Sequence, residues 1–142
     1  MPGFSQPSNG SAPEVRLGTL VEGGLAPAIM AIVDRGVQRR PAQARALRLE
    51  VELRIEERYP PVRIVFGDDI VLVEDGPAPA PGLRITGTLP DLAALMVAPL
   101  VGGLPNPIDA RGRAAVRMFA SRRVRIEGRM GAMRSFLSVV RL

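Results

Sequence analysis

The segment Leu47–Glu56 alternates strictly between apolar and charged residues. Its odd-numbered positions hold leucine, valine and isoleucine, and its even-numbered positions hold arginine and glutamate. Side chains of a β-strand point alternately to the two faces of a sheet, so this pattern predicts a strand with one apolar and one charged face. Because the charges also alternate in sign, we expect the charged face to be a solvated outer surface of an antiparallel sheet.

Two further strands are expected directly after this one. Val62–Gly67 and Ile70–Glu74 are short, rich in β-branched residues and separated by Asp68-Asp69, a turn sequence. Tyr59-Pro60-Pro61 ends the first strand, and Asp75-Gly76 closes the third. We therefore predict a three-stranded meander, one face of which must be covered by other elements.

Helical periodicity predicts elements that could cover this face. The main helix is expected at about Ala26–Arg39, because its apolar residues recur every three or four positions and Pro27 suits a first turn. The apolar spacing from Glu14 onward also allows a short helix before it. Further helices are expected to open at Pro90-Asp91, to span Ala110–Ala120 and to begin at Met130 or Ala132, with additional strands at Leu83–Leu89 and Arg122–Glu127.

Missing residue types exclude several kinds of chemistry. The 142-residue chain has no cysteine and no histidine, and all 19 of its basic residues are arginine. Thiolate metal sites, imidazole acid–base catalysis and lysine Schiff bases are therefore excluded. The acidic pairs Asp68-Asp69 and Glu74-Asp75 could hold a hard cation, but we interpret them as turn residues. We expect a protein that is not an enzyme and carries no cofactor or metal.

The chain is expected to form one domain over residues 14–142, preceded by a disordered tail. Residues 1–13 are polar and rich in proline, glycine and serine, and they do not resemble a signal peptide, so we expect a cytoplasmic protein. The uncharged run Leu92–Leu104 is shorter than the about 20 residues that a membrane span needs. It is interpreted as a buried helix with a loop, or as an apolar gate or wall of a pocket.

From about Ala46 to Leu142 the order of elements resembles the sterol carrier protein 2 (SCP2) family. The amphipathic first strand with its DD and EDG turns, the segment LRITGTLPDLAALM at 83–96 and the segment VRIEGRMGAMRSFLSVVRL at 124–142 carry the resemblance. The chain departs from the family in having no tryptophan, and in having Arg129 where an acidic residue is common. The resemblance implies an α+β fold in which helices cover one face of a five-stranded, largely antiparallel sheet, with an apolar cavity between the layers.

The function implied by the resemblance is non-enzymatic binding or transfer of a hydrophobic small molecule, such as a lipid, a fatty acyl chain, an isoprenoid or a sterol-like compound. An alternative is an interaction module of the same fold, accessory to a lipid- or quinone-handling enzyme. Methionines concentrate in the second half of the chain, where flexible thioethers could adapt to varied apolar ligands, although ordinary core packing is the alternative for each. The predicted ligand-binding residues are Leu92, Leu95, Met96, Met118, Phe119, Met133, Phe136 and Leu137.

Nine arginines follow Asp109, against one glutamate, in a chain of net charge +5. Such a patch is typical of contact with an anionic membrane or an acidic protein, with solvated arginines as the alternative. Nucleic acid is a weaker candidate partner because aromatic stacking platforms are missing. The sequence allows a homodimer, and it allows either an open or a packed cavity. The predicted docking residues are Arg113, Arg117, Arg122 and Arg123.

Overall fold

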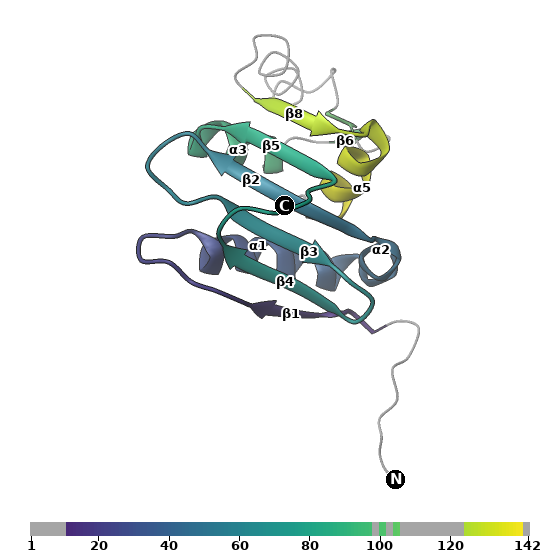
Figure 1. The fold of residues 1–142 in the computed structure, drawn as a ribbon. Coiled ribbons are helices and arrows are strands. Elements are labelled where there is room, and N and C mark those ends of the chain that lie inside the picture. The colour runs from purple at the N-terminus through teal and green to yellow at the C-terminus, as the bar shows by residue number, and fades with distance from the viewer. Residues whose placement is uncertain (1–10, 98–99, 102–103, 106–123, 141–142) are drawn as a thin grey trace.

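The computed structural model describes residues 11–97, 100–101, 104–105 and 124–140. Within these residues the main sheet has six strands in the spatial order β1-β4-β3-β2-β5-β8 (Figure 1). The pairs β1–β4 and β2–β5 are parallel, and the other neighbours are antiparallel. The expected sheet of five largely antiparallel strands is therefore corrected to a mixed sheet of six. Its strands are β1 (Glu14–Leu17), β2 (Leu49–Ile55), β3 (Val62–Phe66), β4 (Ile70–Asp75), β5 (Leu83–Gly87) and β8 (Arg125–Gly128).

Helices cover one face of this sheet, as expected (Figure 1). The helix predicted at Ala26–Arg39 is confirmed as α1 with those bounds, and α2 is a short helix that the periodicity did not indicate. The expected helix Ala110–Ala120 lies outside the described residues. The remaining elements are α2 (Pro41–Ala46), α3 (Leu89–Val97), α5 (Met130–Val140) and a small hairpin of β6 (Leu100–Val101) and β7 (Leu104–Pro105).

The segment before α1 begins with a strand, so the prediction of a short helix there was wrong. β1 pairs with β4 through backbone hydrogen bonds from Glu14 N to the Asp69 carbonyl and from Gly18 N to the Val73 carbonyl, both 2.8 Å long. At the edge of the sheet, β4 has backbone N–H and carbonyl groups that can bond to every second residue of a neighbouring extended chain. This pairing outweighs the helix-like spacing of leucines in the segment, which continues in the loop beyond Gly18.

The core lies between the sheet and the helices. The apolar face of β2 points into it, and Val33 of α1 and Phe136 of α5 are fully buried there. The ring of Phe136 meets the ring of Phe66 edge-on, with 6.2 Å between centroids and an interplanar angle of 78°. Such edge-to-face contacts suit the charge distribution of aromatic rings. α5 is therefore joined to the sheet by a specific aromatic contact.

Asp75 joins β4 to the start of α1. Its carboxylate is 4% exposed and accepts hydrogen bonds from Val21 N at 2.9 Å and from Ala26 N at 3.0 Å. The backbone N–H groups in the first turn of a helix have no partner within the helix, and a carboxylate there is favoured by the helix dipole. Asp75 is thus a buried cap supplied by a distant strand, and its role extends beyond the turn predicted from the sequence.

The charged face of β2 is covered in part, with Glu52 buried and Arg54 exposed. The segment from Gly76 to Gly82 crosses the face of β3 and β2 opposite the helices (Figure 1), and its ends bond to Pro61 and Glu50. Glu52 is completely buried on this face, where it accepts hydrogen bonds from Arg54 at 2.7 Å and Arg84 at 3.2 Å. The expectation of a solvated outer surface was therefore wrong at this position.

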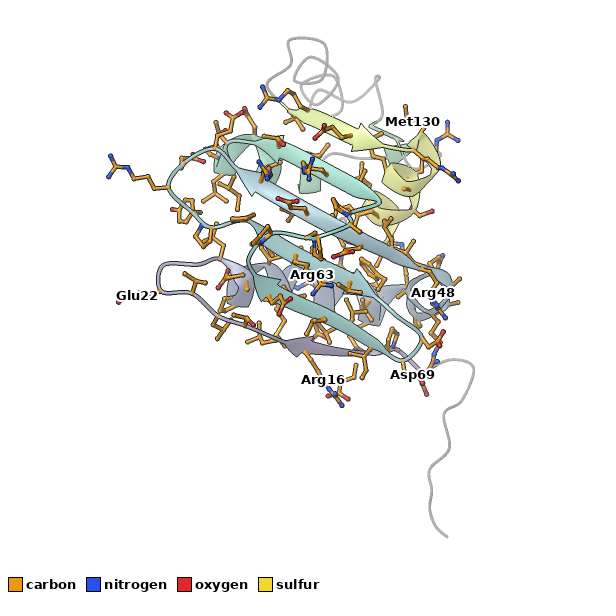
Figure 2. All side chains as sticks on the ribbon, viewed as in Figure 1. Arg16, Glu22, Arg48, Arg63, Asp69 and Met130 are labelled. Carbon is orange, nitrogen blue, oxygen red and sulfur yellow. The ribbon has the colours of Figure 1, made fainter. Side chains whose placement is uncertain are left out.

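A second charge group lies on the same face. Arg63 donates to Glu50 and to Glu74, each at 2.7 Å, and Figure 2 shows Arg63 near the centre of the sheet. Burial alone would raise the pKa of Glu52, but the bonds from its two arginines outweigh burial, and its pKa lies below the ordinary value. The Thr19 N–H and Arg63 likewise lower the pKa of Glu74.

These lowered pKa values predict acid sensitivity. A carboxylate whose pKa is lower in the folded than in the unfolded state stabilises the fold above the unfolded pKa of about 4.3, and this stabilisation is lost as pH falls through the folded pKa. The free energy of unfolding, measured with urea, is expected to be steady above about pH 5.5 and to fall below about pH 5. Glu52→Gln should lower stability at pH 7 by about 1–2 kcal/mol and make the acid slope shallower.

Glu22→Gln, at an exposed loop position labelled in Figure 2, is the matched control and should leave both quantities close to wild type. A difference between wild type and Glu52→Gln that is equally large at pH 3.5 and pH 7 would contradict the charge-based explanation. In that case the effect of the substitution would come from packing.

Candidate functional site

An apolar pocket lies where α1, β2 and α3 meet. Its volume is about 60 Å³. Every lining side chain is a hydrocarbon, so the walls offer no group that could ionise or coordinate a metal. The lining residues are Ile29 and Ile32 of α1, Leu53 and Ile55 of β2, and Leu89, Leu92 and Ala93 of α3.

Local periodicity places these side chains together. Ile29 and Ile32 are three residues apart and share one side of α1, as residues at this spacing do on any helix. Leu53 and Ile55 are alternate residues on the apolar face of β2. The same helical spacing brings Leu89, Leu92 and Ala93 to one side of α3. Two helix stripes and one strand face therefore form the three walls.

The pocket has a buried floor and an accessible mouth. Leu53 and Leu92 are buried, Ile32 and Leu89 are half-buried, and the side chain of Ala93 is exposed. The mouth therefore lies on the α3 side. A path from solvent into the pocket therefore begins at Ala93 and ends at Leu53 on the sheet.

Polar groups hold the first turn of α3 beside the mouth. The Glu57 carboxylate accepts a hydrogen bond from Leu89 N at 2.9 Å, and the Thr88 hydroxyl accepts one from Asp91 N at 3.3 Å. At the N-terminus of a helix, the usual cap is a side-chain oxygen that accepts a hydrogen bond from the backbone N–H three residues further along the chain. These bonds fix the first turn, whereas the rest of the lining is held by apolar contact.

The structure places the predicted ligand-binding residues in different surroundings. Leu92 lines the pocket, and Leu95 is buried in the core on the same helix. Met133, Phe136 and Leu137 are buried on α5 in the core and are absent from the pocket lining. The Met96 side chain, Met118 and Phe119 lie outside the described residues, so their role stays a prediction.

The sequence reasoning did not assign the lining residues of α1 and β2. The signal was present, because Ile29 and Ile32 belong to the apolar stripe of α1, and Leu53 and Ile55 to the apolar face of β2. Both faces were interpreted as packing surfaces only. The predicted residues of the second half that are described on α5 are buried in the core, and their role in ligand binding stays a prediction.

The predicted docking arginines 113, 117, 122 and 123 lie outside the described residues, so contact with a membrane or an acidic protein stays a prediction. Three later arginines are described. Arg129 and Arg134 are exposed on or beside α5, and Arg125 lies 3.5 Å from a Glu56 carboxylate oxygen. Arg129 and Arg134 therefore lie near the start of α5, whereas Arg125 lies at the other end of β8.

Metal sites and membrane-spanning helices are both absent from the described residues. Residues 11–97, 100–101, 104–105 and 124–140 include no group of three or more acidic side chains placed to hold a metal ion. Over the same ranges, none of the helices combines the length and the apolar character needed to cross a membrane.

Comparison with known proteins supports the fold. No protein-family model matches the sequence, and no curated protein matches it. The structure is similar to a UbiJ-SCP2 ubiquinone synthesis protein, with a TM-score of 0.58 and 14% identity over 82% of this chain and 88% of that one. It is also similar to the stereoselective inverting sec-alkylsulfatase Pisa1 from Pseudomonas sp., with a TM-score of 0.51 and 13% identity.

The second match covers 70% of this chain but 14% of the alkylsulfatase, so the chain corresponds to a small part of that enzyme. At these identities the likeness is one of fold. The chain therefore has an α+β fold similar to that of SCP2 domains, in agreement with the resemblance carried by its sequence motifs.

Proposed function

We propose that the protein binds a hydrophobic small molecule non-covalently in the pocket between α1, β2 and α3, and that it performs no chemistry on this ligand. The observation that carries the proposal is the wholly hydrocarbon lining of the pocket. Removal of apolar surface from water, at about 25 cal/mol per Å², would supply the binding free energy. A lipid or a quinone is the favoured class, because a similar fold occurs in a protein named for ubiquinone synthesis.

The size of the pocket implies that α3 moves when ligand enters. Sites for drug-sized molecules enclose about 300–1,000 Å³, whereas this pocket encloses about 60 Å³. Such a volume accommodates only a few atoms of a hydrocarbon chain. Uptake of a longer chain would require the Leu89–Val97 helix to separate from α1, with loss of the contacts made by Leu92.

The small volume also supports a second candidate function. The same fold could serve as an accessory module for a lipid- or quinone-handling enzyme, with the pocket filled by its own walls. Native mass spectrometry of the purified protein, followed by solvent extraction, separates the two. A lipid or quinone bound at near-stoichiometric level supports the binding function. A ligand-free mass, followed by no uptake of an added fluorescent fatty acid or ubiquinone analogue, supports the module.

Ala93→Trp is the sharpest test of the site. Ala93 lines the mouth and is exposed, so an indole there should obstruct entry at little cost to the fold. We expect binding of a fluorescent polyene fatty acid and of a short-chain ubiquinone analogue to weaken by at least about tenfold, equivalent to about 1.4 kcal/mol. Fluorescence titration measures binding of the fatty acid, and displacement of the fatty acid by the ubiquinone analogue measures binding of the second probe.

Ala42→Trp is the matched control, since Ala42 is an exposed alanine of α2 that does not line the pocket. It should bind both probes as wild type does. Equal binding by the two tryptophan variants would show that ligand enters elsewhere, and this site assignment would fail.

A further inference from the structure

β1 is an edge strand, and exposed apolar side chains gather around it. Among the described residues, five large hydrophobic side chains are exposed, and four of them belong to this edge of the sheet. Leu17 ends β1, Leu20 and Val21 lie in the loop that follows, and Ile70 pairs with Glu14 across the parallel ladder. Exposed apolar side chains concentrated in one place commonly mark an interaction surface.

The outer side of β1 has backbone groups directed away from the sheet. Glu14 N and Gly18 N bond to β4, so residues 14, 16 and 18 use their backbone groups within the sheet. The N–H and carbonyl groups of Val15 and Leu17 point in the opposite direction, because successive residues of a strand alternate. An edge of this kind offers its backbone donors and acceptors to another strand, and the charges and the proline at β1 limit which strand can pair there.

We propose that this edge pairs with the same edge of a second copy of the chain, antiparallel and centred on Val15. In this arrangement Val15 faces Val15 of the second copy, and the two exchange N–H to carbonyl hydrogen bonds. Leu17 N–H then meets the outward carbonyl of Pro13. Because proline has no N–H, the ladder cannot extend further in that direction, which limits the choice of register.

The charges of β1 are self-complementary in this register. Glu14 faces Arg16 of the second copy, and Arg16 faces Glu14, at non-hydrogen-bonded positions where side chains approach most closely. Within one chain, Arg16 already bonds to Glu14 at 2.7 and 3.1 Å, and both side chains are more than half exposed. Figure 2 shows Arg16 at the rim of the sheet, pointing away from it. Each guanidinium could therefore bridge two carboxylates.

A second copy is favoured over an unrelated strand because one short sequence supplies both halves of the contact. A two-fold axis requires that residue i meets residue j and that j meets i. The register centred on Val15 meets this condition with opposite charges. A register centred on Arg16 would place two arginines face to face and is disfavoured. The predicted assembly is a dimer with one sheet continuous across its two-fold axis.

Charge exchange tests the proposal. Light scattering after gel filtration at about 100 µM should give wild type a mass about twice the 15.2 kDa of one chain. Glu14→Arg and Arg16→Glu, each alone, place like charges opposite each other and should weaken association by at least about tenfold. An equimolar mixture of the two variants should regain the doubled mass, as should the double variant Glu14→Arg/Arg16→Glu.

The mixture also controls for folding, because damage to β1 itself cannot be repaired by mixing. Far-ultraviolet circular dichroism should show that each single variant is folded. A monomeric wild type at 100 µM would overturn the proposal and leave the edge to a different partner. Unchanged dimers of both single variants, or a mixture that stays monomeric, would overturn it equally.

Discussion

Phe136→Ala is expected to lower the free energy of unfolding by about 3–5 kcal/mol, the usual cost of removing a fully buried phenylalanine ring. The side chain has no exposed surface and lies edge-on to Phe66, so its removal leaves a cavity between α5 and the sheet. Neighbours in a close-packed core relax only partly into such a space. Urea unfolding at pH 7 measures the change.

The control is Met130→Ala on the same helix. Met130 is 57% exposed and labelled at the rim of the molecule in Figure 2, so its truncation should change stability by less than about 0.5 kcal/mol. Phe136→Leu should cost clearly less than Phe136→Ala and should leave probe binding unchanged, since Phe136 does not line the pocket. Weaker binding by a stably folded Phe136→Leu variant would support the ligand-binding role predicted from the sequence.

Elements with a strong period of their own could be predicted from the sequence. The bounds of α1, the apolar face of β2 and the start of α5 all follow from side chains that recur along one element. Such patterns are local, because each reflects one face packed against a core. The SCP2-like fold then follows from the order of these elements, which the resemblance supplies and the similarity in fold supports.

Properties that depend on which segments meet could not be predicted in this way. Nothing in the sequence of β1 shows that it joins β4, and nothing in β5 shows that it runs parallel to β2. The buried state of Glu52 has the same origin, because an alternating strand does not indicate what lies across its polar face. Here Arg54 and Arg84 bond to Glu52, and the proline-rich crossover from β4 to β5 passes over the same face of the sheet (Figure 1).

The pocket, too, could be predicted from the sequence only in part. Each of its walls is an apolar stripe that periodicity reveals, but the meeting of the three stripes at Ile29, Leu53 and Leu89 is a property of the tertiary fold. Of the methionines of the second half, Met133 is buried in the core on α5, which is the packing alternative given for it, and Met130 is exposed. α1, which supplies one pocket wall, is held in place by the sheet and by its close packing against α5.

Gly36→Ala is the second substitution with a large expected effect. Gly36 is buried in α1 where this helix meets α5, and a Cβ atom added to it would lie 2.0 Å from the Val139 carbonyl oxygen and 3.0 Å from Val140 Cα. Backbone atoms cannot rotate away, so the two helices would have to separate and lose packed contacts. We expect a loss of about 2–4 kcal/mol in the free energy of unfolding, even after the better helix propensity of alanine is counted.

Gly131→Ala on α5 is the matched control, because nothing lies within 4 Å of the added Cβ. There the propensity of alanine acts alone, and stability should rise by up to about 0.5–1 kcal/mol. The two glycine substitutions should therefore change stability in opposite directions in the same urea experiment. A Gly36→Ala protein as stable as wild type would mean that α1 and α5 do not approach as closely as the structure shows, and the α1 wall of the pocket would then need to be placed again.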